Sequence, residues 1–414
     1  MQRVMRVLLV LLIAVTASCS SRVQQPVAGV YRATVKLPGG DAPFKLEIAQ
    51  ENGAVILYLS NGSERTRVPN VTVQDGELRA VFPGYENFLR AELHRDKLVG
   101  NVTLIKTGGV EQVIPFAAKL GDAARFFDTA AADNADVAGR WDVSFTDDAG
   151  KTTKGVALLE QEHDRITGTV MTPTGDHRYL EGQVRDDELL LSTFAGGLPY
   201  LYKIKVDQKG ALQGEYWQGL KSHEKLTAVR NADATLEDPE AMTRMKADAG
   251  RFDFTFRDVD GQPVSLSDER YRGKVVVVSL GGSWCPNCHD ETMFLAPFYR
   301  EYRDKGFEVI ALMFERHGEF DKAAAAARHF RDDLGVEYAT LIAGISDADE
   351  ASKALPTLSG IYGFPTTLFI DKQGKVRKIH TGFTGPATGQ HYDDYVREFR
   401  SFIDELLAEP AAAT

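Results

Sequence analysis

One segment close to residue 280 constrains the fold of this chain more than any other. Val275-Val276-Val277-Val278-Ser279-Leu280 is a nearly continuous apolar run, which is typical of a buried strand in a parallel sheet. Gly281-Gly282-Ser283 follows as a turn. Trp284-Cys285-Pro286-Asn287-Cys288 then opens an amphipathic stretch that continues to about Lys305. A buried strand that turns tightly into a helix predicts an α/β domain with two cysteines at the helix start.

The C-x-x-C spacing has a chemical consequence, because it lets the two sulfurs form an easily exchanged disulfide. The helix N-terminus supplies unpaired N–H groups and the positive end of the helix dipole, which stabilise a thiolate on Cys285. Cys288 lies one turn further along and is expected to be the more shielded, so it is suited to resolving a mixed disulfide. A cis proline in Phe364-Pro365-Thr366 would place backbone beside the sulfurs, where it could pair with an incoming peptide.

Alternating strand and helix patterns continue to the end of the chain. Further strands are expected at Phe307–Phe314, Thr366–Ile370 and Lys375–His380, and helices at Asp321–Leu334 and Tyr392–Leu407.

These motifs resemble the TlpA/ResA-like periplasmic thiol–disulfide oxidoreductases, which have the thioredoxin fold. The resemblance extends from about Gly250 to Leu407, and the residues that carry it are Ser283–Cys288, Glu291, Gly363–Thr367 and Phe369–Gly374. It implies that Cys285 is the nucleophile and Cys288 the resolving thiol, joined in a redox-active disulfide. By the same resemblance Pro365 is the cis proline and Glu291 the active-site carboxylate. The residues expected to contact the substrate are Trp284, Phe364, Pro365 and Thr366.

The family resemblance also implies the partners. It predicts a reductase that exchanges disulfides with protein substrates and receives electrons from a membrane thiol-transfer protein. No cofactor and no metal are expected. Since the formal net charge is −11, phosphate backbones are repelled and nucleic acid is not an expected partner.

Two residues depart from the family pattern. Ser279 stands where an Asp or Asn is usual and cannot act as a carboxylate base, so Glu291 is the better candidate for proton transfer; its structural alternative is a helix cap. Met293 replaces a helix proline, which predicts that the kink of the family's helix is absent or shifted.

The same residues allow other interpretations. Cys285-Pro286-Asn287-Cys288-His289 also matches C-x-x-C-H, the attachment motif of c-type haem. Zinc binding would need a fourth ligand, for which His289 points poorly. A peroxiredoxin-like thiol peroxidase would use Cys288 as its reactive cysteine. A static disulfide in a non-enzymatic surface binding protein is the remaining alternative. His289 itself is expected to be half exposed, and Asp290 to be a charge that favours the helix dipole.

Residues from Val27 to about Arg230 follow a different pattern, with strands of period two. Phe44, Leu46 and Ile48, for example, alternate with polar residues, and turn dipeptides such as Asn52-Gly53 punctuate the region.

This region is internally repeated. Val27-Ala28-Gly29-Val30-Tyr31 recurs as Val137-Ala138-Gly139-Arg140-Trp141, 110 residues later, and two further landmarks recur at offsets of 111 and 114. We therefore expect two tandem antiparallel all-β modules, at residues 27–120 and 137–230. Each should hold about eight short strands in a small barrel or sandwich. A spacer or docking role is favoured over a ligand pocket, and His163 and His177 are expected at the surface.

Low-apolar segments separate these parts at residues 121–136 and 231–249. In the second, Asp238-Pro239-Glu240 is expected to begin a short helix. The thioredoxin-like domain then occupies residues 250–408, and residues 409–414 form a tail.

The N-terminus has the pattern of a secretory signal. Arg3 and Arg6 precede the apolar run Val7–Val15, which is too short for a membrane-spanning helix, and Thr16-Ala17-Ser18 then precedes Cys19. Small residues before a cysteine resemble the lipobox of bacterial lipoproteins, although Thr16 replaces the usual leucine. This predicts a signal peptide at residues 1–18, lipidation of Cys19 and a tether at residues 19–26. An ordinary cleaved signal is the alternative.

The signal places the mature chain outside the cytoplasm, where disulfides persist. Ser20, directly after the anchoring cysteine, resembles an outer-membrane sorting signal. The expected location is therefore the periplasmic side of a membrane, with the outer membrane indicated by Ser20.

Overall fold

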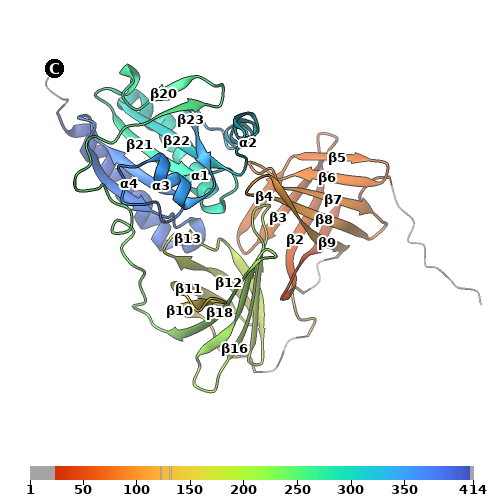
Figure 1. Ribbon diagram of the computed structural model, residues 1–414. Coiled ribbons are helices and arrows are strands. Elements are labelled where there is room, and N and C mark those ends of the chain that lie inside the picture. Colours follow the sequence, from red (N-terminus) through yellow and green to blue (C-terminus); the bar gives the residue numbers. More distant parts are fainter. Residues whose placement is uncertain (1–23, 122–123, 130, 132, 411–414) are drawn as a thin grey trace, which may run out of the picture.

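The computed structural model describes residues 24–121, 124–129, 131 and 133–410. It contains two β-sheets followed by an α/β domain, as the sequence predicts. Figure 1 shows three lobes, with β4 of the first sheet and β13 of the second on the sides that face the α/β domain. The predicted signal peptide, Cys19 and Ser20 lie outside the described residues, as do residues 411–414.

The first β-module is a nine-stranded antiparallel sheet in the order β4-β3-β2-β1-β9-β8-β7-β6-β5. Its strands are β1 (Gly29–Leu37), β2 (Gly40–Glu51), β3 (Ala54–Asn61), β4 (Glu64–Val68), β5 (Asn70–Gln74), β6 (Glu77–Val81), β7 (Phe88–Leu93), β8 (Lys97–Lys106) and β9 (Val110–Leu120). The expected alternation holds in β2, where Phe44, Leu46 and Ile48 are buried in the core.

The second β-module repeats this topology. Its strands are β10 (Gly139–Asp147), β11 (Thr152–Glu162), β12 (Arg165–Thr172), β13 (Gly175–Asp176), β14 (Leu180–Arg185), β15 (Glu188–Thr193), β16 (Tyr200–Val206), β17 (Leu212–Gln218) and β18 (Ser222–Arg230). Both sheets run as meanders in which the first strand of the module pairs with its last, and β12 pairs with both β11 and β14 to close the second sheet. This shared arrangement supports the duplication inferred from the sequence, with nine strands rather than eight in each copy.

One of the two histidines expected at the surface is not there. His163 is exposed in a turn, as predicted. His177 instead stacks against both Tyr200 and Tyr216 inside the second β-module, with ring centroids 4.9 Å and 5.1 Å away. The polar residues around His177 indicated an exposed position, but its ring packs against aromatic side chains of β16 and β17.

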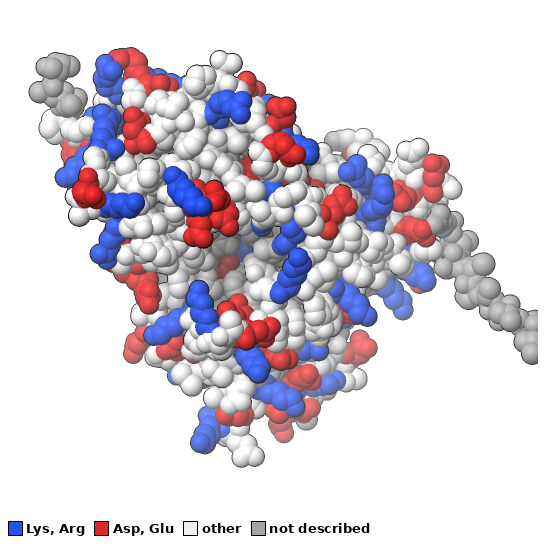
Figure 2. Space-filling view, viewed as in Figure 1, with Lys and Arg blue, Asp and Glu red and all other residues white. Residues whose placement is uncertain are grey.

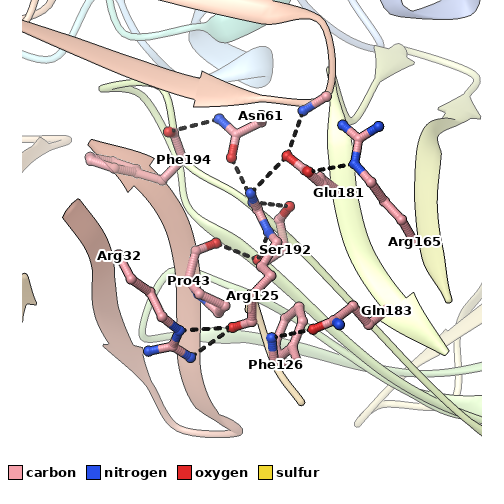
Figure 3. A network of polar contacts seen from close by, with 11 residues as sticks. Arg32, Pro43, Asn61, Arg125, Phe126, Arg165, Glu181, Gln183, Ser192 and Phe194 are labelled. Atoms are coloured by element: carbon pink, nitrogen blue, oxygen red, sulfur yellow. Dashed lines mark hydrogen bonds and ion pairs between the residues drawn. The ribbon is translucent and has the colours of Figure 1, made fainter. Parts of the chain in front are cut away.

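The segment between the modules is part of the structure that joins them. Arg125 lies at the centre of a polar network (Figure 3), where its guanidinium donates to Glu181 of the second module at 3.0 Å and to Asn61 of the first at 2.7 Å. Its carbonyl oxygen accepts a hydrogen bond from Arg32. Because buried polar groups need partners, this network fixes the two modules against each other.

The α/β domain contains a seven-stranded sheet in the order β20-β19-β23-β22-β21-β24-β25. Its strands are β19 (Thr255–Asp258), β20 (Pro263–Ser265), β21 (Val275–Gly281), β22 (Phe307–Glu315), β23 (Ala339–Ile345), β24 (Thr366–Ile370) and β25 (Val376–Thr381). Its α-helices are α1 (Pro286–Tyr302), α2 (Phe320–Asp333), α3 (Ala348–Ala354) and α4 (Gln390–Ala408), with short 3-10 helices at Glu269–Tyr271, Arg303–Lys305 and Pro386–Thr388.

Each element expected in this domain is present within a few residues. The buried strand β21 is central, parallel to β22 and antiparallel to β24. Residues of α1, α2 and α4 share one hydrophobic cluster with β21, and α3 belongs to a second cluster. β19, β20, β23 and α3 were not predicted.

The helix expected at Asp238-Pro239-Glu240 does not form. Asp238 Oδ1 accepts a hydrogen bond from the Glu240 N–H, and the Asp238 carbonyl accepts one from Ala241, which makes a turn. The segment then runs along the α/β domain, where Thr381 N–H donates to the Pro239 carbonyl. This contact favours the turn over a helix, because it satisfies the Pro239 carbonyl, which a helix would have used internally.

Candidate active site

The two cysteines of the C-x-x-C motif form a disulfide at the N-terminus of α1. Cys285 is the N-cap residue of the helix, and its sulfur lies 3.2 Å from the backbone nitrogen of Cys288. The Cα atoms are 5.2 Å apart. The helix N-terminus therefore points a backbone N–H at Cys285 Sγ, which is the position where a thiolate is best stabilised.

The strand that precedes the motif provides space for the second sulfur. A Cβ on Gly281, the last residue of β21, would lie 3.2 Å from Cys288 Sγ and 3.4 Å from Cys288 Cβ. Gly281 therefore allows α1 to pack close to the end of the strand, with Cys288 on the inner side.

The cis-proline loop, residues 363–366, lies opposite the disulfide. The Phe364–Pro365 peptide bond is cis, and the Phe364 carbonyl oxygen is 3.6 Å from Cys285 Sγ. Trp284 packs edge-on against the Phe364 ring at 5.8 Å, and its indole N–H donates to the Phe314 carbonyl at 2.7 Å. Thr366 is fully buried and its hydroxyl donates to the Gly363 carbonyl. The structure thus places the four predicted substrate-contact residues around the disulfide, with Thr366 beneath the loop.

Glu291 is buried behind the disulfide and is not a surface cap. It lies one turn along α1 from Cys288, with 1% of its surface exposed. Its carboxylate accepts hydrogen bonds from Ser279, at 2.5 Å, and from Thr367, which are paired neighbours on β21 and β24. Burial raises the pKa of Glu291 to about 7, although both hydroxyls oppose the shift.

Cys288 and Glu291 are one turn apart on α1, and the register of β21 explains why both meet the same face of that strand. Residues two apart on a strand share a face of the sheet. Ser279 holds Glu291, and Gly281 contacts Cys288 on that same face. The residue that departs from the family pattern therefore anchors the carboxylate.

A second buried carboxylate was missed by the sequence interpretation. Glu315, at the end of β22, accepts hydrogen bonds from the N–H of Ser283 at 3.0 Å and from its hydroxyl at 2.7 Å. Burial raises the pKa of Glu315 to about 7. The signal available in the sequence was an acidic residue directly after the apolar run Phe307–Phe314. The two hydrogen bonds of Glu315 to Ser283 hold the turn that precedes the cysteines.

His289 is buried, contrary to the prediction, and the neighbouring Asp290 is buried as well. The His289 ring stacks on Tyr85 of the first β-module at 3.7 Å, and its Nε2 lies 2.7 Å from the Ser283 carbonyl oxygen. Burial lowers the pKa of His289 to about 3, so it is neutral at pH 7. Asp290 forms an ion pair with Arg178 of the second β-module at 3.0 Å. Both residues are covered because the β-modules pack on the start of α1.

The cysteines are covered as well. Cys285 is 4% exposed and Cys288 3% exposed, so the expected difference in shielding between them is absent. A Cβ on Gly197 of the second module would lie 3.2 Å from Pro286 Cγ, and Arg178 donates to the Pro286 carbonyl. Loops of the β-modules therefore close over the motif.

A disulfide at a helix N-terminus, beside a cis proline and at the end of a central strand, defines a thiol–disulfide oxidoreductase domain of the thioredoxin type. Residues 246–395 match the family model described as Redoxin. The thiol-disulfide oxidoreductase ResA of a Bacillus cereus strain is 30% identical over 146 residues, which are 35% of this chain and 73% of that protein.

The protein of the same name from Bacillus thuringiensis (strain Al Hakam) is 28% identical over 145 residues, again 35% of this chain and 73% of that protein. A solved structure from Chlorobium tepidum TLS is described as a thiol:disulfide interchange protein of the thioredoxin family. It is 21% identical, covers 39% of this chain and 100% of that one, and has a TM-score of 0.30. Through its C-terminal part, the chain belongs to the ResA family of thiol–disulfide oxidoreductases. Both β-modules lie outside the matched residues.

In the part of the chain that the structure describes, no helix is both long and apolar enough to span a membrane.

Proposed function

We propose that the protein exchanges disulfides with protein substrates through Cys285 and Cys288, on the extracytoplasmic side of a membrane to which Cys19 anchors it. The observation that carries the exchange is the Cys285–Cys288 disulfide at the helix N-terminus, with the Cys288 N–H directed at Cys285 Sγ. The compartment and the anchor rest on the N-terminal sequence alone.

The exchange proceeds in two steps, and each step forms one disulfide bond and breaks another. In the reduced protein the Cys285 thiolate attacks one sulfur of a substrate disulfide, forms a mixed disulfide and releases the other substrate sulfur as a thiolate. Cys288 then loses its proton and attacks Cys285 Sγ, which forms the Cys285–Cys288 disulfide and releases the second substrate thiolate. Two electrons pass to the substrate, and a membrane thiol-transfer protein restores the dithiol.

The proposed direction is reduction, and the redox equilibrium of the cysteine pair tests it. The oxidised protein would be equilibrated with glutathione buffers of known composition, and the fraction of Cys285–Cys288 dithiol measured by alkylation. A reductase should have a potential well below that of the strong oxidant DsbA, which lies at about −120 mV. A value close to −120 mV would reverse the assigned direction.

The anchor is tested separately. Cys19→Ala should leave the chain unlipidated, so that it stays as precursor or moves to the soluble fraction, whereas the wild type should partition into detergent. Phase partitioning with Triton X-114 measures both. Ser20→Ala is the matched control, since it changes the sorting residue and keeps the lipidated cysteine. Wild-type protein in the aqueous phase would show that Cys19 is not an anchor.

A further inference from the structure

The turn of one hairpin in the second β-module lies directly on the cis-proline loop. This hairpin, Thr172–Asp176, consists of the end of β12, the turn residues Pro173 and Thr174, and β13. A Cβ on Gly363, two residues before Pro365, would overlap the methyl group of Thr174. Since Gly363 has no side chain, the hairpin approaches the loop more closely than any other residue there would permit.

The hairpin also packs against Gly382, which is hydrogen-bonded to Pro365. Gly382 N–H donates to the Pro365 carbonyl at 2.7 Å. A Cβ on Gly382 would lie 2.8 Å from the carbonyl carbon of Thr174 and 3.0 Å from the Pro173 oxygen. The hairpin backbone therefore crosses the face of the cis proline on which an incoming peptide would have to lie.

The same hairpin reaches the C-x-x-C motif. A Cβ on Gly175 would overlap the side-chain amide of Asn287, which itself donates to the Phe383 carbonyl at 3.1 Å. The contact places hairpin backbone against Asn287, one of the two residues between the cysteines of the disulfide.

Three polar contacts, one of Asp176 and two of Arg178, hold the hairpin in this position. Asp176 accepts a hydrogen bond from the Gly385 N–H at 2.5 Å. Arg178 lies between Glu64 of the first β-module, at 2.6 Å, and Asp290 of α1, at 3.0 Å. These contacts lie at the end of the hairpin, whereas its tip at Thr174 is held by van der Waals contact.

The surroundings leave space for the hairpin to move. A cavity of about 210 Å³ lies between the second β-module and the α/β domain, and Thr172, Pro173, Gly382 and Phe383 are among its lining residues. Figure 2 shows that the molecular surface is also hollowed between these two lobes. Displacement of the hairpin tip therefore does not require the opening of a filled core.

We propose that the Thr172–Asp176 hairpin is a lid that occupies the peptide-binding face of the redox site and selects substrates by size. Protein disulfides reach Cys285 only when the tip moves aside, and small disulfides need less displacement. The proposal rests on the disulfide exchange proposed above, and it assigns Thr174 and Gly363 as specificity-determining residues.

The test compares two disulfide substrates, insulin and oxidised glutathione, with the full-length reduced protein. Thr174→Ala removes the methyl contact with Gly363, and Gly363→Ala wedges the tip away from the opposite side. Because observed rates scale with the open fraction, each variant should react with insulin about tenfold faster than wild type, with about twofold change or less for glutathione. Thr153→Ala, an exposed position on β11 of the same module, is the matched control and should change neither rate.

The possible results distinguish a failure of the lid proposal from a failure of the proposed disulfide exchange. Unchanged insulin rates in both variants, with normal glutathione exchange, would overturn the lid and leave the proposed function standing. An equal increase with both substrates would overturn selection by size. Absence of exchange with either substrate in every form would instead refute the proposed function. Thermal unfolding of each variant shows whether a rate change comes from the redox site or from a loss of folding. The two variants act from opposite sides of the contact, so a folding defect in one still allows the test with the other.

Discussion

Replacement of Cys288 by serine should make the protein accumulate mixed disulfides with its substrates. The nucleophile Cys285 remains at the helix N-terminus, beside the cis-proline loop, while the thiol that clears the intermediate is lost. In cells that express Cys288→Ser, conjugates that disappear on reduction should be abundant on non-reducing gels. Mass spectrometry of the trapped chains would identify the substrates.

Cys285→Ser is the matched control, because it keeps Cys288 and removes the attacking sulfur. It should trap no substrate, and its exchange activity should fall to background. The chain has only one other cysteine, Cys19, whose thiol the proposed lipid would block. Equal trapping by the two variants, or trapping only by Cys285→Ser, would assign the reactive sulfur to Cys288 and favour the peroxidase-like alternative.

Glu291→Gln should slow disulfide exchange about 100-fold near neutral pH, within the range of about 10²–10⁴ that general acid–base catalysis supplies. Burial raises the pKa of Glu291 to about 7, so near neutrality its carboxylate can accept the proton that Cys288 must lose. The wild-type rate should rise as pH passes through 7, and the difference between the proteins should shrink in alkali, where solvent removes the proton. Stopped-flow measurements from pH 5 to pH 9 test this.

Glu291→Gln should lower the exchange rate but raise the free energy of unfolding. A gain in stability would show that the slower exchange does not come from a damaged fold. A pKa raised from 4.5 to about 7 means that the folded state holds a proton that the unfolded state releases, so Glu291 costs stability as pH rises through this window. Glutamine resembles the protonated acid. Glu291→Gln should therefore match wild type near pH 4, below the unfolded pKa, and exceed it by up to about 3 kcal/mol at pH 8.

Urea unfolding at the two pH values measures this difference. Glu398→Gln, at an exposed position of α4, is the control and should change neither the exchange rate nor the pH dependence of stability. If Glu291→Gln exchanges at the wild-type rate at every pH, Glu291 has only a structural role.

Local patterns in the sequence were sufficient for much of the fold. The apolar run Val275–Leu280 predicted the central strand, and the strand–turn–C-x-x-C order predicted the disulfide at the start of α1. The alternation in β2 and the offset of about 110 residues predicted two β-modules, which share one meander topology. These features are readable because they depend on neighbouring residues, whose spacing follows the period of a strand or helix.

The environment of the redox site was decided only by tertiary structure. His289 and Asp290 have the local sequence of an exposed first helical turn, yet Tyr85 and Arg178 bury them. Arg178 is 108 residues from Pro286, whose carbonyl it binds, and no periodic pattern relates the two positions. Burial depends on which surfaces pack together over such separations. Local patterns were therefore enough to predict a disulfide of the thioredoxin type, whereas the enclosure of its cysteines, its helix start and its cis-proline loop depends on how the β-modules pack.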